Sequence, residues 1–158
     1  MKQISTHVSY EDVIHSDTAI KLGISNIPDE TQLSNITRLI ENVYEKLFEH
    51  FNISISIHSC FRCKKLNSAV GGAISSQHVA LHGAAMDITT GNHSMVTNEE
   101  LYSHILNYMD FDQLIAEDIR DDDKINWIHV SYVSPTENRK ETKIMAKINN
   151  KTVYEPIP

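Results

Sequence analysis

Hydrophobic positions in the first third of the chain recur every three or four residues. Within residues 29–50 they are Leu33, Ile36, Leu39, Ile40, Val43 and Leu47. This spacing gives a helix one buried face, and we interpret that helix as scaffold. Residues 10–24 are expected to form shorter helical pieces, because Ser16 is a good N-cap and Gly23 is a natural stop.

The pattern then changes to alternation. Residues 52–59 alternate apolar and polar side chains, as a half-buried strand does. Further strands are expected at residues 85–90, 111–117, 125–133 and, at a sheet edge, 143–148, with an acidic loop over residues 118–124. Helices are expected at residues 64–70 and 97–109, the second opened by a capping box of Thr97 and Glu100. This order predicts an α+β fold with a central, mainly antiparallel sheet and helices packed on one face.

The composition fits one folded domain spanning residues 1–158, with 41% hydrophobic and 22% charged residues. The net charge of -7 argues against a protein that neutralises phosphates, so nucleic acid is not an expected partner. No segment has the apolar length of a signal peptide or of a membrane span. The chain is therefore expected to begin in the cytoplasm, without membrane insertion, and to act as a monomer.

The candidate chemistry is concentrated in residues 76–88. This stretch holds His78, His82 and Asp87 among small residues and glycines, and His129 lies in the strand expected at residues 125–133. Neighbouring strands can present side chains on one face, so Asp87, His129 and a histidine of the preceding loop can meet. Two imidazoles and one carboxylate, with a fourth position open, are typical of a catalytic zinc site. The competing interpretation is accidental clustering, because the chain has nine histidines.

Two further charged residues are candidates for the chemistry. Glu117, at the end of a predicted strand, could serve as the general base of a zinc hydrolase, although it could equally begin the acidic loop. Arg62 could hold a substrate carboxylate or polarise a scissile carbonyl, or it could form an ordinary salt bridge. Cys60 and Cys63 lack the second pair that a zinc ribbon requires, and we interpret them as free thiols beside a pocket.

Several short motifs occur in an order that is informative as a set. They are Ser59-Cys60-Phe61-Arg62, Gly71-Gly72 followed by Ser76-Gln77-His78, Gly83-x-Ala85-x-Asp87, Phe111-Asp112-Gln113-Leu114-Ile115-x-Glu117, and Trp127-Ile128-His129. Together they resemble the zinc D-alanyl-D-alanine carboxypeptidase-like murein peptidases, including phage-type members, which share a fold with the hedgehog signalling domain. The resemblance covers about residues 16–140.

The resemblance implies a function and a set of roles. It implies His78, Asp87 and His129 as ligands of a zinc ion, Glu117 as the catalytic base, Arg62 as a catalytic and substrate-binding residue, and Ser76 as a second substrate-binding residue. The implied reaction is hydrolysis of a peptide bond near a D-amino acid in bacterial peptidoglycan, by a carboxypeptidase or an endolysin-type endopeptidase. The implied setting is a phage or prophage enzyme that reaches the cell wall after release.

One departure from the family pattern affects the choice of ligand. Four residues separate His78 from Gly83, where the family usually has two, and the extra pair makes His82 a rival ligand. The match of Gly71-Gly72 and Ser76-Gln77-His78 favours His78. His82 could then face the cleft or form a hydrogen bond to a residue that binds the metal. The alternative to an enzyme is a non-hydrolytic metal-binding module, such as a virion structural protein with the same fold.

Overall fold

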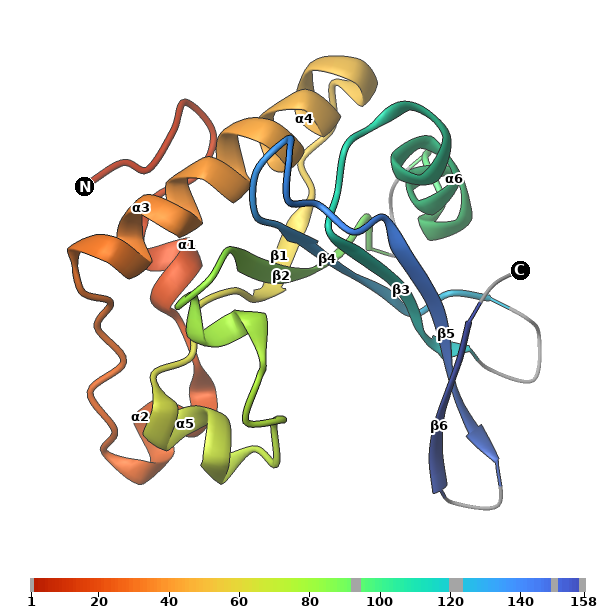
Figure 1. Ribbon diagram of the computed structural model, residues 1–158. Coiled ribbons are helices and arrows are strands. Elements are labelled where there is room, and N and C mark those ends of the chain that lie inside the picture. The colour runs from red at the N-terminus through yellow and green to blue at the C-terminus, as the bar shows by residue number, and fades with distance from the viewer. Residues whose placement is uncertain (1, 92–94, 120–123, 149–150, 157–158) are drawn as a thin grey trace.

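A six-stranded sheet organises the structure, a computed structural model that describes residues 2–91, 95–119, 124–148 and 151–156 (Figure 1). The strands are β1 (Ser56–Ser59), β2 (Ala84–Thr89), β3 (Gln113–Ile119), β4 (Trp127–Tyr132), β5 (Glu141–Ile148) and β6 (Lys151–Pro156). Their order across the sheet is β1-β2-β4-β3-β5-β6. All neighbours are antiparallel except β3 and β5, so the predicted α+β fold with a mainly antiparallel sheet is confirmed.

Most of the helices begin after a residue whose side chain accepts a hydrogen bond from the first turn. The helices are α1 (Tyr10–Ile14), α2 (Asp17–Leu22), α3 (Glu30–Leu39), the π-helical η1 (Ile40–Tyr44), α4 (Glu45–Phe51), α5 (Lys64–Ala69), the 3-10 helix η2 (Gln77–Val79) and α6 (Asn98–Tyr108). Thr97 and Glu100 form the expected capping box of α6. Gly23 ends α2 in the left-handed conformation, with φ of 61°. None of the helices within the described residues is long and apolar enough to cross a membrane.

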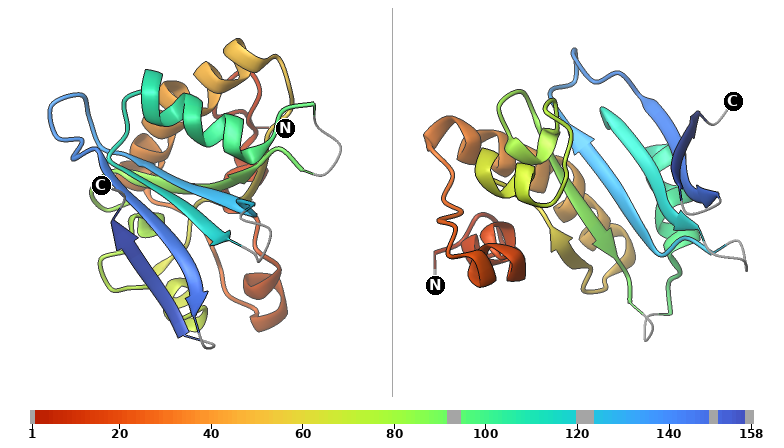
Figure 2. Two further views of the ribbon diagram at one scale, coloured as in Figure 1. Left: turned by 90° about the vertical axis from the view of Figure 1, so that its right-hand side faces the viewer. Right: turned by 90° about the horizontal axis from the view of Figure 1, so that it is seen from below.

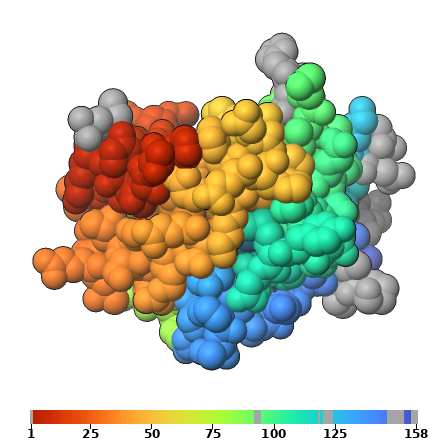
Figure 3. All heavy atoms as spheres, turned by 90° about the horizontal axis from the view of Figure 1, so that it is seen from above, coloured from red at the N-terminus to blue at the C-terminus, as the bar shows by residue number. Residues whose placement is uncertain are grey.

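The long helix expected over residues 29–50 is a continuous run of α3, η1 and α4, and its apolar face packs on the sheet. Figure 2 shows this run and α6 on one side of the sheet, while α5 lies on the other side. Figure 3 views the helical layer from outside, with α3 and α4 beside α6. The buried core lies between this layer and the sheet.

Alternation along the strands gives the sheet two different faces. On the helix-covered face, Met86 of β2 is opposite Val130 of β4, and both are completely buried in the core. One residue along, Asp87 is opposite His129, and these side chains point to the other face because successive residues of a strand alternate. The same two strands therefore supply the core and the candidate site.

Three details of the predicted elements need correction or limits. The strand over residues 143–148 was expected at a sheet edge, which is wrong, because β6 pairs with β5 and covers it. The strand expected from residue 52 begins at Ser56, since Asn52 takes a left-handed conformation (φ 51°) and ends α4. Residues 120–123 of the predicted acidic loop lie outside the described residues, and residues 118–119 belong to β3.

Candidate metal centre

Strand register brings Asp87 and His129 together. The two residues are direct partners across the antiparallel β2–β4 pair, and Asp87 Oδ1 lies 2.9 Å from His129 Nδ1. The same oxygen lies 3.2 Å from Nε2 of His78. One ligand atom from each of the three residues lies within 4.8 Å of the others, and all three side chains are largely shielded from solvent. Such a set of nitrogen and oxygen donors fits a zinc ion.

His78 is held in a defined tautomer. It lies in η2, whose N-cap is Ser76, and its Nδ1 is 2.7 Å from the carbonyl oxygen of Cys60. A carbonyl only accepts hydrogen bonds, so Nδ1 carries the proton and Nε2 presents its lone pair towards Asp87. Orientation of an imidazole by a carbonyl is common around metal ligands. Burial lowers the pKa of His78, which favours the neutral form that binds a metal.

Asp87 is the most strongly perturbed carboxylate of the site. Burial alone would raise its pKa, but its interactions with His78 and His129 hold it well below its usual range. The second oxygen, Oδ2, accepts a hydrogen bond from Nη2 of Arg62 at 2.9 Å. Arg62 Nε also donates to Oγ of Ser59 at 2.9 Å, which fixes the guanidinium against the end of β1. Arg62 thus forms a salt bridge, and its partner is a candidate metal ligand.

Glu117 lies on the same face of the sheet as the cluster. It is opposite Trp127 in the β3–β4 pair, and Trp127 Nε1 donates to Glu117 Oε2 at 2.7 Å. Burial, and then the negative charge of Asp87, raise the pKa of Glu117. A carboxylate whose pKa is raised is a stronger base, so this residue suits proton transfer near the cluster.

A family model described as peptidase M15 matches residues 6–131. The chain belongs to the peptidase M15 family. Peptidases of this family are zinc-dependent, which agrees with the donor set of His78, Asp87 and His129. A sequence comparison with curated proteins finds no match. Strands β5 and β6 lie beyond the part of this M15 chain that the family model matches.

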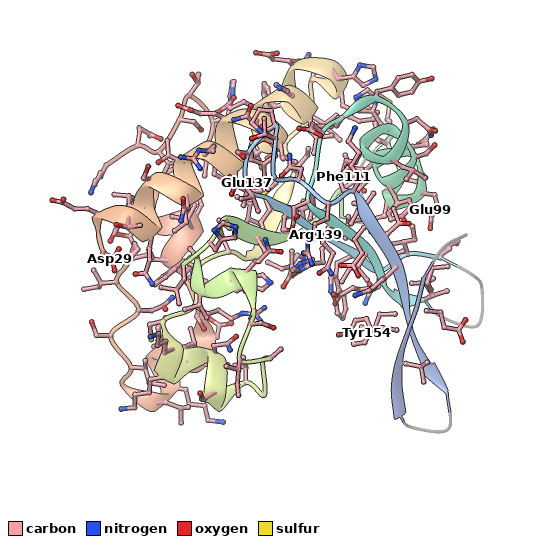
Figure 4. The ribbon with its side chains drawn as sticks, viewed as in Figure 1. Asp29, Glu99, Phe111, Glu137, Arg139 and Tyr154 are labelled. Atoms are coloured by element: carbon pink, nitrogen blue, oxygen red, sulfur yellow. The ribbon has the colours of Figure 1, made fainter. Side chains whose placement is uncertain are left out.

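The candidate centre of this M15 chain opens into a cleft of about 620 Å³. Its lining includes the three candidate ligands with Arg62, Ser76 and Glu117, and also residues that the sequence did not identify: Gln113, Arg139, Glu141, Lys143 and Tyr154. Figure 4 shows the Tyr154 side chain directed from β6 towards the cleft. Sequence reasoning missed this wall because it depends on the parallel β3–β5 pairing, which no local pattern marks.

The remaining candidates lie outside the cluster. His82 is exposed over 77% of its side chain, and its Nε2 lies 3.8 Å from Oε1 of Glu137, so it does not join the three grouped residues. Ser76 Oγ accepts a hydrogen bond from the backbone N–H of His78 at 3.4 Å, and it also lines the cleft. Cys60 and Cys63 are free thiols. Burial raises the pKa of Cys60 to about 12, while Cys63 Sγ caps α5, so both fit structural roles.

Proposed function

We propose that this M15 peptidase is a zinc-dependent enzyme that hydrolyses a peptide bond in the stem peptides of bacterial peptidoglycan. The supporting observation is the convergence of His78, Asp87 and His129 beside Glu117 on one face of the sheet. His78 Nε2, Asp87 Oδ1 and His129 Nδ1 would hold the ion. Zinc in a site of this kind supplies Lewis-acid activation of water and of a carbonyl group.

Glu117 is assigned the proton transfers. Hydrolysis adds water across the peptide bond, so one proton must leave the attacking water and one must reach the departing amine. Glu117 can accept the first proton and deliver it to the amine, because its raised pKa lets it hold a proton between the two steps. The hydrogen bond from Trp127 holds one carboxylate oxygen in place during this exchange.

Arg62 is assigned a positioning task and a substrate contact. Its hydrogen bond to Asp87 Oδ2 orients that carboxylate and leaves Oδ1 towards the two imidazoles. Arg62 also lines the cleft, where a guanidinium can donate to a peptide carbonyl of the substrate. Ser76 is assigned a substrate contact on the same grounds. The cell-wall substrate and a phage or prophage lysis setting rest on the sequence resemblance described above.

Mass spectrometry of muropeptides incubated with zinc-loaded protein tests the proposal. Wild type is expected to release defined fragments, and Glu117→Ala is expected to lose about 10²- to 10⁴-fold in rate while it keeps its zinc. Glu155→Gln, an exposed acid on β6, is the matched control and should behave as wild type. A zinc-loaded wild type that cleaves no muropeptide would contradict the enzyme assignment and favour a non-hydrolytic metal-binding module.

A further inference from the structure

Strands β5 and β6 form a hairpin that lies beyond the matched part of this M15 chain. The family model ends at residue 131, whereas β5 begins at Glu141 and β6 ends at Pro156. Figures 1 and 2 place α5 on one side and the hairpin on the other, with β4 and β3 between them. Three side chains of the hairpin, Glu141, Lys143 and Tyr154, line the cleft. The family assignment therefore does not extend to this wall of the cleft.

Tyr154 lies on the cleft face of the hairpin. It is directly opposite Met145 in the β5–β6 pair, and residues opposite each other in a sheet point to the same face. Met145 is two residues along β5 from Lys143, which lines the cleft. Lys143 is paired with Ile115 of β3, and Glu117 follows two residues later. Tyr154, Met145 and Glu117 therefore share one face of three adjacent strands.

The side chain of Tyr154 is turned towards the cleft that holds the candidate metal centre. Figure 4 shows it directed from β6 into the cleft, whose lining it shares with Glu117 and Asp87. Burial, and then the negative charges of Glu117 and Asp87, raise the pKa of Tyr154. Carboxylates have this effect only from nearby, because solvent screens more distant charges. The raised pKa keeps the phenol protonated at neutral pH, so Tyr154 offers a hydrogen-bond donor to the cleft.

The hydroxyl group of Tyr154 is available to a ligand. Tyr154 is 53% exposed, and among the described residues its hydroxyl has no hydrogen-bond partner. Two other donors near the centre are already engaged. Arg62 donates to Asp87 Oδ2, and the indole of Trp127 donates to Glu117 Oε2. A substrate in the cleft can therefore accept a hydrogen bond from Tyr154 without breaking one that the fold already makes.

The proposed reaction creates a negative charge that such a donor can stabilise. Attack of water on a peptide carbonyl makes the carbon tetrahedral and shifts an electron pair onto the carbonyl oxygen. A hydrogen-bond donor held in advance at that oxygen stabilises the charged state more than the neutral carbonyl of the bound substrate. Such a donor therefore raises kcat and changes KM little.

We propose that Tyr154 is a further catalytic residue, whose hydroxyl donates a hydrogen bond to the oxygen of the scissile carbonyl as that oxygen gains charge. This inference rests on the proposed function and adds to it a residue of the β5–β6 hairpin. The attacking water forms the new bond to the carbonyl carbon and gives a proton to Glu117. The carbon–nitrogen bond then breaks, the oxygen returns its electron pair to re-form the carbonyl, and the amine takes the proton from Glu117. Tyr154 keeps its own proton throughout, so it acts as a donor and not as a second acid.

Tyr154→Phe tests this role, because it removes the hydroxyl and keeps the ring. On a muropeptide that wild type cleaves, kcat should fall about 10²-fold, with KM and zinc content near the wild-type values. Tyr108→Phe is the matched control and should behave as wild type, because Tyr108 lies on α6, is 80% exposed and is outside the cleft. An unchanged kcat in Tyr154→Phe, or a higher KM alone, would overturn the role of Tyr154 and leave the proposed function standing. Cleavage of no muropeptide by zinc-loaded wild type would overturn both.

A binding measurement separates the charged state from the bound substrate. A phosphinate analogue of the stem peptide carries negatively charged oxygen on a tetrahedral phosphorus, and so mimics the reacting carbon. Calorimetric titration of the zinc-loaded proteins should give a dissociation constant for the phosphinate about 10²-fold higher in Tyr154→Phe than in wild type. The uncleaved peptide should bind equally well to Glu117→Ala and to Glu117→Ala/Tyr154→Phe. Equal weakening of both ligands, or unchanged binding of the phosphinate, would show that Tyr154 does not stabilise the reacting oxygen.

Discussion

The two faces of the sheet are built by the same strands and have opposite chemistry. On the helix-covered face, Met86, Ile128 and Val130 are completely buried among apolar neighbours. On the cleft face, Asp87 and His129 are nearly as well shielded, yet they are polar and bonded to each other. Burial alone therefore does not distinguish core from site here. The distinction is what each buried group contacts.

The difference shows how the fold can support a charged cluster. The apolar face supplies stability through burial of hydrocarbon, while the cleft face holds groups that cost free energy to bury unless they are paired. Because residues of the two faces alternate along a strand, a substitution on the apolar face should change stability, and one at the adjacent position should change metal binding. The predictions below test this separation, beginning with the largest effect.

Replacement of Asp87 by alanine should abolish zinc binding and turnover. Asp87 is the one residue of the cluster that contacts both imidazoles and Arg62, so its loss removes a ligand and leaves these three side chains without their common partner. Zinc content and peptide cleavage measure the effect. Met86→Leu is the control at the adjacent position, and it should keep both because it conserves apolar volume. Full zinc occupancy in Asp87→Ala would remove this residue from the ligand set.

The neighbours Ile128 and His129 should separate stability from metal binding. Ile128→Ala creates a cavity in the core and should lower the free energy of unfolding by about 2–5 kcal/mol, with zinc binding retained. His129→Ala should instead lose zinc and change the stability of the zinc-free protein much less. Denaturant unfolding and metal analysis on both variants provide the comparison. A larger loss of zinc-free stability in His129→Ala than in Ile128→Ala would contradict the assignment of Ile128 to stability and His129 to metal binding.

The sequence predicted the helical scaffold and the cleft-face residues better than the outer strands. Repetition at three or four positions marks a helix locally, and Asp87 and His129 were each expected in a strand, where pairing of the two strands could bring the side chains together. The family motifs then favoured His78 over His82, and the structure places His78 with the other two residues and His82 outside the group.

Strand β6 could not be foreseen from local pattern. It follows two asparagines, contains a proline and has only Thr152, Val153 and Tyr154 as β-formers. Its place depends on pairing with β5, which itself pairs with β3, a strand distant in the sequence. The π-helical turn of η1 is a similar case, because no residue of Ile40–Tyr44 marks it. Strand pairing decides the place of β6, and β5 and β6 are the strands that complete the cleft wall.

Asp112 is expected to be a buried carboxylate whose negative charge stabilises the fold. Its side chain is 1% exposed and accepts three hydrogen bonds from Arg139. Burial alone would raise the pKa of Asp112, but these bonds lower it below the ordinary value of 3.8. A lowered pKa contributes stability that is present above about pH 4 and is lost as the pH falls through the folded-state value.

Asp112→Asn should therefore lower the free energy of unfolding at pH 7 by about 1–2 kcal/mol, a modest figure because Arg139 is half-exposed and solvent screens the pair. The difference from wild type should shrink as the pH falls below 4. Urea unfolding of the zinc-free proteins between pH 3 and pH 7 measures it. A difference that stays constant across this range would show that the charge of Asp112 contributes nothing.

The charge of Glu117 should destabilise the zinc-free fold, whereas that of Asp112 stabilises it, and its effect should be the smallest of those predicted. Its folded-state pKa is raised above the ordinary value of 4.5 by burial and by Asp87, so the zinc-free native state binds a proton more readily than the unfolded chain. Stability then falls as the pH rises from 4.5 through the folded-state pKa, and at neutral pH the charged carboxylate is a net cost. Glu117→Gln removes that cost and keeps an acceptor for Trp127.

The zinc-free variant should melt a few degrees higher than zinc-free wild type at pH 7, and at the same temperature near pH 4. Thermal melts of both zinc-free proteins at pH 4 and pH 7 measure the difference. A lower Tm of the variant at pH 7 would show that charged Glu117 stabilises the fold, as Asp112 does, and would contradict its assignment as the base.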